Sequence, residues 1–273
     1  MFGSHGSTFR SRACCPPMTA SERPTSSISS QRTSGAARAW PVARPGNRCC
    51  RGRVEQALEP LRTAYGDLCE LAAGLTEATS WQPSGCPGWT VRDLLLHHLG
   101  DAQRALVALA TASSTGIADR DAVTYWVDSP GRSDPESRQL RATRTIASAY
   151  RLDGLRSMYV ETLQAVVALA ARVEPSAIAP TQGRTLRVDD LQATLVTEAA
   201  LHHVDLIASL DAPGPSTSPL AVVRRTLDGL LGRPSPAGWD DTTWALIGTG
   251  RRPLRPHERT ELGEDADRLP LLC

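Results

Sequence analysis

The sequence predicts an all-α protein built around a bundle of about four long helices. Two observations carry this prediction. Apolar residues return at steps of three and four over several long segments, which is the period of an amphipathic helix. No set of segments alternates apolar and polar residues in the manner of half-buried strands, and the sequence contains no internal repeat. Long amphipathic helices bury their apolar faces by packing together as a bundle.

The first two helices are marked by different signals. The first is expected to begin at Val54, where the apolar residues start to recur. The second follows a segment dense in turn residues, 83–89, and has the clearest start in the sequence. Thr90 and Asp93 have the spacing of a capping box, in which the N-cap side chain and the residue three positions later satisfy each other's backbone N–H groups. This helix is expected to run to about Ala112.

Later helices follow from the same periodicity and from helix breakers. Asp189 and Asp190 favour a helix start near Val188, because negative charge is favourable at a helix N-terminus. The Pro- and Gly-rich segment 212–216 ends that helix. Further helices are expected at 136–150, 154–173, 188–210, 220–231 and 256–262, with a loop at 175–183 and a strand or helical segment at 244–247. The chain then divides into an N-terminal tail (1–53), a helical bundle (54–212) and a short, mostly helical C-terminal extension (213–273).

The N-terminal tail, residues 1–53, differs in composition from the rest of the chain. It holds nine Arg and a single acid, Glu22, and is rich in Ser, Pro and Gly without apolar periodicity. Such a segment buries too little apolar surface to offset the entropy of ordering it, so we expect it to be disordered. One interpretation is a basic tail that contacts nucleic acid or anionic lipid. The other is an upstream extension from a misassigned start codon, with Met18 or a later site as the true start.

Composition excludes several classes of protein. The chain has 273 residues and a formal net charge of +1, and its longest apolar runs fall well short of the roughly 20 residues of a membrane-spanning helix. Beyond residue 53, 21 basic residues face 28 acidic ones, which argues against a nucleic-acid-binding core. The seven Cys show no CxxC spacing, and no apolar segment follows the N-terminal Arg residues, so a cytoplasmic location is expected. All Lys and Arg positions are occupied by Arg, which suggests a GC-rich coding sequence and hence a high-GC bacterium as the source.

The strongest candidates for chemistry are Glu198 and His202, in the predicted 188–210 helix. Residues four apart project from one helix face, so this carboxylate and this imidazole can bind one metal ion together. Their neighbours on the helix are largely apolar, and an unpaired carboxylate is costly to bury there. The ExxxH spacing also occurs on solvated helix faces, so it predicts half of a metal site that requires a third ligand.

His97 and His98, in the predicted helix that starts near Thr90, can supply the third ligand from across the bundle. The apolar stripe of this helix favours His98, because His97 lies about 100° away around the helix axis. The alternative is that one of the two is a hydrogen-bonded interior histidine and the other is exposed. The residues alone leave this choice open.

Weaker candidates lie near the ends of predicted elements. Cys86 stands just ahead of a helix whose dipole can lower a thiol pKa, although its place in a turn also suits a packing role. Arg251 and Arg252 follow two glycines and can bind a substrate carboxylate. A solvated turn fits the same pattern.

Two separated motifs resemble the mycothiol-dependent maleylpyruvate isomerase family of the DinB-like superfamily. The first is the run CPGWTVRDLLLH that begins at Cys86 and ends at His97. The second, about a hundred residues later, is Glu198-x-x-x-His202-x-x-Asp205. Segments 239–241, 248–254 and 262–270 are also similar to the C-terminal tail of many such proteins. The resemblance covers residues 54–273 and leaves the Arg-rich N-terminal tail outside it.

The resemblance implies a DinB-like four-helix bundle that holds a divalent metal, usually zinc, through His97, Glu198 and His202. His97 matches the family's histidine eight positions after the Trp of the CPGW motif, so the resemblance favours it over His98. Asp205 matches a family aspartate and is expected to orient a ligand or anchor the helix.

The implied site has a defined chemistry. Two histidines and one carboxylate leave an open position on zinc, which can bind a thiol and lower its pKa. The resemblance implies mycothiol as that thiol, which occurs in high-GC actinobacteria and fits the Lys-free composition, and hence a transferase or isomerase acting on a small electrophile. The alternative is a non-catalytic metal-binding module with a regulatory or structural role. A bundle of this size is also compatible with a homodimer.

Overall fold

The computed structural model describes residues 48–127 and 138–272. Within this part the chain is mostly helical, which confirms the predicted fold class. The expected disorder of the N-terminal tail concerns mainly residues 1–47, which lie outside the described residues. The elements, in chain order, are α1 (Arg48–Gly74), α2 (Glu77–Ser80), α3 (Val91–Ala110), η1 (Thr124–Trp126), α4 (Arg138–Ala149), α5 (Leu152–Ala170), β1 (Ile178–Thr181), β2 (Arg184–Arg187), α6 (Val188–Leu206), α7 (Thr217–Leu231), α8 (Asp241–Gly248), α9 (Pro256–Leu262) and η2 (Gly263–Arg268).

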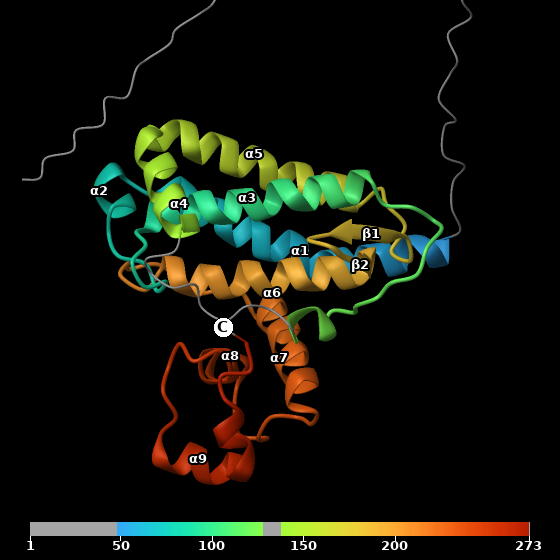
Figure 1. The fold of residues 1–273 in the computed structure, drawn as a ribbon, viewed down its shortest axis with the longest axis vertical. Helices are drawn as coiled ribbons and strands as arrows, with labels where there is room; N and C mark the ends of the chain where they lie inside the picture. The colour runs from blue at the N-terminus through green and yellow to red at the C-terminus, as the bar shows by residue number, and fades with distance from the viewer. Residues whose placement is uncertain (1–47, 128–137, 273) are drawn as a thin grey trace, which may run out of the picture. The chain divides into compact units, whose positions relative to one another are not determined.

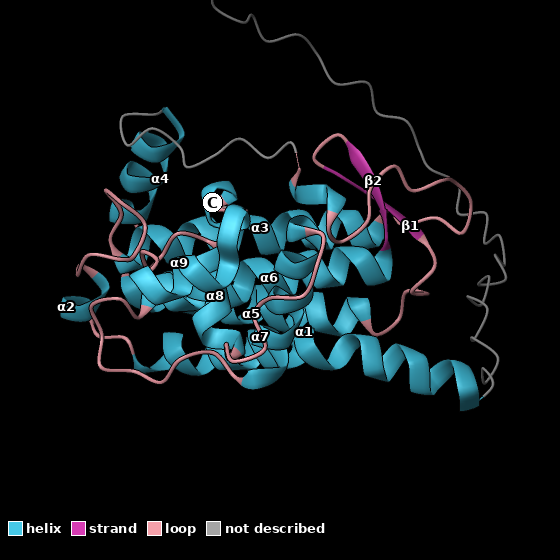
Figure 2. Ribbon diagram, turned by 90° about the horizontal axis from the view of Figure 1, so that it is seen from below, coloured by secondary structure: helices cyan, strands magenta, loops and turns pink. Residues whose placement is uncertain are grey.

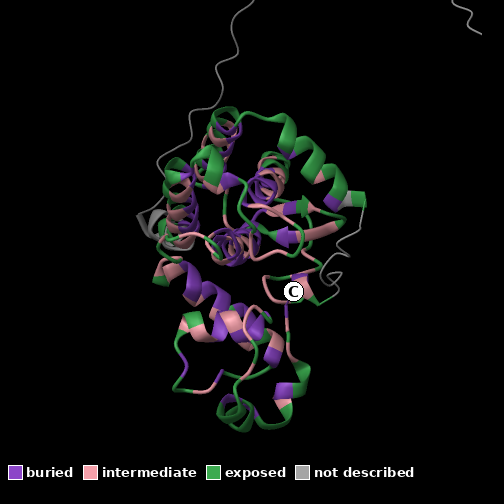
Figure 3. Ribbon diagram, turned by 90° about the vertical axis from the view of Figure 1, so that its left-hand side faces the viewer, coloured by how far each residue is buried: buried purple, intermediate pink, exposed green. Residues whose placement is uncertain are grey.

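Helices α1, α3, α5 and α6 form the four-helix bundle (Figure 1). α3 packs against α5 and α6, and α1 packs against the same two helices, so α1 and α3 occupy opposite corners. The buried residues gather on the inner faces of these helices (Figure 3). They form one hydrophobic core, whose members with no exposed surface include Leu61, Leu94, Leu155, Leu163 and Ala199. The DinB-like bundle expected from the sequence is thereby confirmed.

The start of α3 is held by the predicted capping box. The Thr90 side chain accepts a hydrogen bond from the Asp93 N–H, and the Asp93 carboxylate accepts one from the Thr90 N–H at 2.8 Å. These contacts satisfy two backbone donors that the first turn of a helix leaves unpaired. The helix ends at Ala110, two residues before the predicted end. The capping box therefore sets where the polar residues of the second and third turns lie along the bundle.

Helix α1 begins earlier than its apolar periodicity predicts. It starts at Arg48, six residues before Val54, and it contains Pro60. The first residue of this helix described as buried is Leu58. An amphipathic pattern is produced only by the part of a helix that packs on a core. The periodicity therefore predicted a start at Val54 and gave no sign of the helical residues before it.

A β-hairpin replaces part of the loop expected at 175–183. β1 and β2 pair antiparallel through a tight turn in which Gln182 and Gly183 both have positive φ. Figure 2 shows the hairpin at one end of the bundle. Ala179 and Leu186 are fully buried and join the bundle core, and their burial stabilises the hairpin. The prediction of a loop was wrong here because Pro180 counts against a strand and Gln-Gly is not a typical hairpin turn.

The C-terminal extension builds a second core on the outer side of α6. α7 packs against α6 and α1, and α8 packs against α7. Leu201 of α6 belongs to this second core, together with Leu227 and Trp244. α6 is therefore buried on two sides. The segment 244–247 lies in α8, whose N-cap Asp240 accepts a hydrogen bond from the Thr243 N–H at 2.6 Å, so the strand alternative was wrong.

The short elements α2, η1 and η2 were not predicted, since one or two turns carry too little periodicity to be recognised. In residues 48–127 and 138–272, we find no helix with both the length and the apolar character needed to cross a membrane.

Candidate metal centre between α3 and α6

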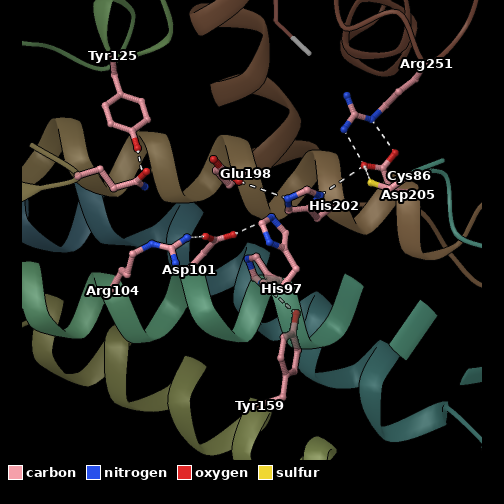
Figure 4. Close-up of polar contacts among 12 residues, drawn as sticks. Cys86, His97, Asp101, Arg104, Tyr125, Tyr159, Glu198, His202, Asp205 and Arg251 are labelled. Atoms are coloured by element: carbon pink, nitrogen blue, oxygen red, sulfur yellow. Dashed lines mark hydrogen bonds and ion pairs between the residues drawn. The ribbon is translucent and has the colours of Figure 1, made fainter. Parts of the chain in front are cut away.

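α3 and α6 pack side by side and carry six polar side chains at or near their contact (Figure 4). Three come from two adjacent turns of α3 and three from successive turns of α6. They are His97, His98, Asp101, Glu198, His202 and Asp205. The structure thus brings together residues that are about a hundred positions apart in the chain.

His202 lies at the centre of this group. Its Nε2 is 3.4 Å from Oε2 of Glu198, and its ring centroid is 5.3 Å from that of His97. Its other nitrogen, Nδ1, is 3.4 Å from Oδ2 of Asp205. The two nitrogens therefore have separate surroundings, with Nε2 on the side of Glu198 and Nδ1 held by Asp205.

The pKa values of His97 and His202 shift in opposite directions. Burial lowers the pKa of His97 to about 4, and the neighbouring His202 adds to this effect. His97 is therefore neutral at pH 7, which is the form that binds a metal. Burial also disfavours the charged form of His202, but its contacts with Asp205, Cys86 and Glu198 outweigh burial and raise its pKa well above the ordinary value. A metal bound at His202 would release that proton.

Glu198 is ionised in this setting. Burial raises the pKa of its carboxyl group, but the contact with His202 outweighs this and the net shift is downward. Its side chain is 30% exposed, compared with 14% for His202. A carboxylate that is ionised and partly open to solvent is available as an oxygen ligand.

His98 lies in the bundle core. Only 1% of this residue is exposed, and its Nδ1 is 2.8 Å from the Tyr159 hydroxyl of α5. Burial lowers the pKa of His98 to about 3, so its ring is neutral. This position fits the alternative that one of the adjacent histidines is a hydrogen-bonded interior residue. The apolar stripe of α3 had favoured His98 as the third ligand, but this stripe follows the face that packs into the core, where His98 is bonded to Tyr159.

Asp205 is fully engaged by neighbouring groups. Nε and one terminal nitrogen of Arg251 donate to its two oxygens at 2.9 and 2.7 Å, and the Cys86 thiol donates at 3.3 Å. Burial opposes ionisation of Asp205, but His202 and Arg251 outweigh it and hold the pKa of Asp205 far below its usual range. Asp205 therefore lies against Nδ1 of His202, and its role in orienting a metal ligand stays a prediction.

These contacts bear on the three weaker sequence candidates, Cys86, Arg251 and Arg252. Cys86 packs against the bundle core and caps Asp205, which agrees with the packing role weighed for it. Arg251 binds Asp205 through two nitrogens, and its third, Nη1, is buried without a partner among the described residues. Its contact with a substrate anion stays a prediction. Arg252 is paired with Glu258 at 2.7 Å, away from this group.

Asp101 was missed by the sequence reasoning. Its Oδ2 is 3.4 Å from Nε2 of His97. Ligand atoms of Asp101, His97 and His202 all lie within 4.8 Å of one another. A signal was present, since Asp101 follows His97 by the same four-residue step that separates Glu198 from His202.

The donor set fits a divalent metal. Imidazole nitrogens and carboxylate oxygens are the ligands that zinc and similar ions take in proteins. Cys86, His202 and Asp205 form a second cluster of potential ligands, but both Asp205 oxygens are already bound by Arg251. The fold and this site together define a helical-bundle protein with a candidate divalent-metal centre on two facing helices.

The family follows from comparison with known proteins. The chain belongs to the family described as Mycothiol maleylpyruvate isomerase N-terminal domain, whose model matches residues 61–207. The matched segment includes the whole of α3 and α6, and hence all six polar side chains of the candidate site.

Two solved structures are similar to this chain. One is a crystal structure of the mycothiol-dependent maleylpyruvate isomerase, with 20% identity and a TM-score of 0.46. The other is a point mutant of that enzyme, with 18% identity and a TM-score of 0.48. Each alignment covers 65% of this chain and 69% of the other. No curated protein matches this chain.

Proposed function

We propose that this protein is a cytoplasmic, divalent-metal-dependent enzyme that uses mycothiol as cosubstrate and acts as an isomerase or S-transferase on a small electrophile. Family membership supports the thiol and the enzyme class. The residues between α3 and α6 support the metal. In this proposal His97, Glu198 and His202 bind the metal, which is zinc, and Asp205 orients His202.

The observation that carries the proposal is the position of His202. Its ring lies against His97, and its Nε2 lies 3.4 Å from Glu198. His202 therefore contacts one potential ligand on its own helix and another on the facing helix. An ExxxH pair on a solvated face would have no such partner across the bundle. The pKa of His97, lowered to about 4, keeps that donor free of a proton at neutral pH.

The chain's own residues prepare the site for this chemistry. A divalent metal with an open position would lower the pKa of a bound thiol and so supply a thiolate nucleophile. Asp205 faces Nδ1 of His202, which leaves Nε2 as the donor on the Glu198 side. Arg251 holds Asp205 in place and offsets its charge, so the extension after residue 212 supports a ligand of the bundle. We also retain Arg251 as a candidate contact for a substrate anion.

Metal content after mutation tests the site. We expect about one equivalent of zinc in the wild type, and none in His97→Ala or Glu198→Ala. His98→Ala is the control for His97→Ala, because it removes the adjacent imidazole on the same helix. Elemental analysis of the purified proteins gives the result, with thermal melting to check that each variant folds. Folded wild-type protein that takes up no added zinc would contradict the proposal.

Thiol chemistry tests the activity. Zinc-loaded protein is expected to conjugate mycothiol with, or isomerise, at least one member of a panel of small electrophiles, and Glu198→Ala is expected not to.

The alternative function is a non-catalytic metal-binding module. A specific observation favours it: Asp101 adds a carboxylate beside the proposed ligands. Stoichiometric zinc without any thiol binding or turnover would support that alternative.

A further inference from the structure

We propose that Asp101 is a fourth metal-binding donor at this centre, so that α3 and α6 each contribute one histidine and one carboxylate. The inference rests on the proposed metal site and extends its donor set. Neither the sequence motifs nor the family match assigns a role to Asp101.

The first observation is an unpaired buried oxygen. The side chain of Asp101 is only 13% exposed. One of its oxygens, Oδ1, is paired with Arg104, whereas Oδ2 is buried and has no hydrogen-bond partner among the described residues. An unsatisfied buried acceptor costs about 1–3 kcal/mol, and more when it is charged. A cation bound at Oδ2 would remove that cost.

The second observation is the spacing of the donors. Two ligand atoms that each lie about 2.0–2.1 Å from a tetrahedral zinc are about 3.3–3.4 Å apart. Nε2 of His97 is 3.4 Å from Oδ2 of Asp101, and Nε2 of His202 is 3.4 Å from Oε2 of Glu198. Direct N–H···O hydrogen bonds are shorter, at about 2.7–3.2 Å. Each 3.4 Å separation is thus compatible with two ligands of one ion, and ligand atoms of His97, Asp101 and His202 all lie within 4.8 Å of one another.

The third observation is that the two carboxylates face a common space. Asp101 and Glu198 line one cavity of about 20 Å³, together with Arg104 and residues of the β-hairpin. About 10–15 Å³ of such volume holds one water molecule, so the cavity has room for a single small species. His97 and His202 do not line this cavity, but each lies 3.4 Å from one of its two carboxylates (Figure 4).

Arg104 orients this donor. Its terminal nitrogen pairs with Oδ1 of Asp101, three residues earlier on α3, and leaves Oδ2 directed at His97. Four protein donors fill a tetrahedral zinc site. A thiol could then bind the zinc only if Asp101 dissociated from the metal or if the zinc took a fifth ligand. Asp101 therefore decides whether the zinc has an open coordination position.

Zinc affinity tests the assignment. Affinity is measured by competition with a chromophoric chelator for the wild type, Asp101→Asn and Asp153→Asn. Asp153 is the matched control, because it also pairs with an Arg three residues later, Arg156, at 2.7 Å, and its side chain is 75% exposed. We expect Asp101→Asn to weaken zinc binding by more than about 100-fold, beyond the 10–100-fold that follows loss of a residue that only orients a ligand. Asp153→Asn is expected to bind as the wild type does.

A second variant reports ligation directly. In Asp101→Cys the zinc X-ray absorption spectrum should gain a sulfur neighbour at about 2.3 Å that the wild type lacks. Melting curves check that the variants fold. Wild-type affinity in Asp101→Asn, with no zinc–sulfur distance in Asp101→Cys, would overturn the role of Asp101 and leave the three-ligand proposal standing. Failure of the wild type itself to bind zinc would overturn both.

Discussion

Two tyrosines in the bundle core are predicted to differ in how their replacement by Phe affects the stability of the protein. The Tyr159 hydroxyl lies 2.8 Å from Nδ1 of His98, and both residues are almost completely buried. Tyr65 is equally buried and its ring lies 5.8 Å from that of His98, but its hydroxyl has no hydrogen-bond partner among the described residues. Tyr159→Phe and Tyr65→Phe each remove one oxygen from the same core.

The expected magnitudes follow from what each hydroxyl contacts. Tyr159→Phe leaves a polar ring nitrogen of His98 buried and unpaired, which costs about 1–3 kcal/mol of unfolding free energy. Tyr65→Phe removes a buried group that is already unsatisfied, so it should leave stability unchanged or increase it. For a domain of this size each kcal/mol shifts the melting temperature by about 2–4 °C, so Tyr159→Phe should melt about 2–12 °C below the wild type.

Thermal melting followed by circular dichroism, with urea unfolding as a second measure, compares the two variants with the wild type. Both variants are measured at pH 7, where His98, whose pKa burial lowers to about 3, is neutral. Equal destabilisation by both variants, or a neutral Tyr159→Phe, would refute the reasoning, because the contrast depends only on which hydroxyl has a partner.

Three further predictions concern the bundle and the extension. Leu155→Ala, at a position with no exposed surface, should cost about 2–5 kcal/mol in urea unfolding. Thr90→Ala, which removes the N-cap of α3, should cost about 1 kcal/mol by the same method. Arg252 lowers the pKa of Glu258 to about 2, so the stability from this pair is present above about pH 4.5 and is lost as the pH falls toward 2. Between pH 6 and pH 2 the melting temperature of Glu258→Gln should therefore fall less than that of the wild type. Equal decreases in the two proteins would contradict this prediction.

The predicted elements agree with the structure where local signals are strong. α3 begins where Thr90 and Asp93 predict it, because a capping box involves only residues three positions apart. The β-hairpin was missed because its stability comes from the burial of Ala179 and Leu186 on the bundle rather than from a recognisable turn. The segment 244–247 was ambiguous for a related reason, since a short apolar run does not distinguish a buried helix from a strand.

The residues of the candidate site also fall into those that local spacing predicts and those that depend on helix packing. The spacing of Glu198 and His202 was readable, because a four-residue step places both on one helix face. The environments of His97 and His98 depend on how α3 is rotated against α5 and α6, which residue order does not specify. Asp101 was overlooked because a four-residue step between polar residues is common on helices. Only its unpaired Oδ2 beside His97 and His202 distinguishes it from a solvated acid.

Residue order along single helices was therefore enough for the helical class, the start of α3 and the ExxxH pair, since these depend on contacts within one or two turns. The packing of helices placed Tyr159 on His98 and directed Arg251 onto Asp205 rather than leaving it in a solvated turn. Arg251 and Asp205 are 46 positions apart, and Cys86 and Asp205 are 119 apart. Such contacts depend on how the helices are rotated and spaced relative to one another. Both are determined only when whole helix faces pack together in the core.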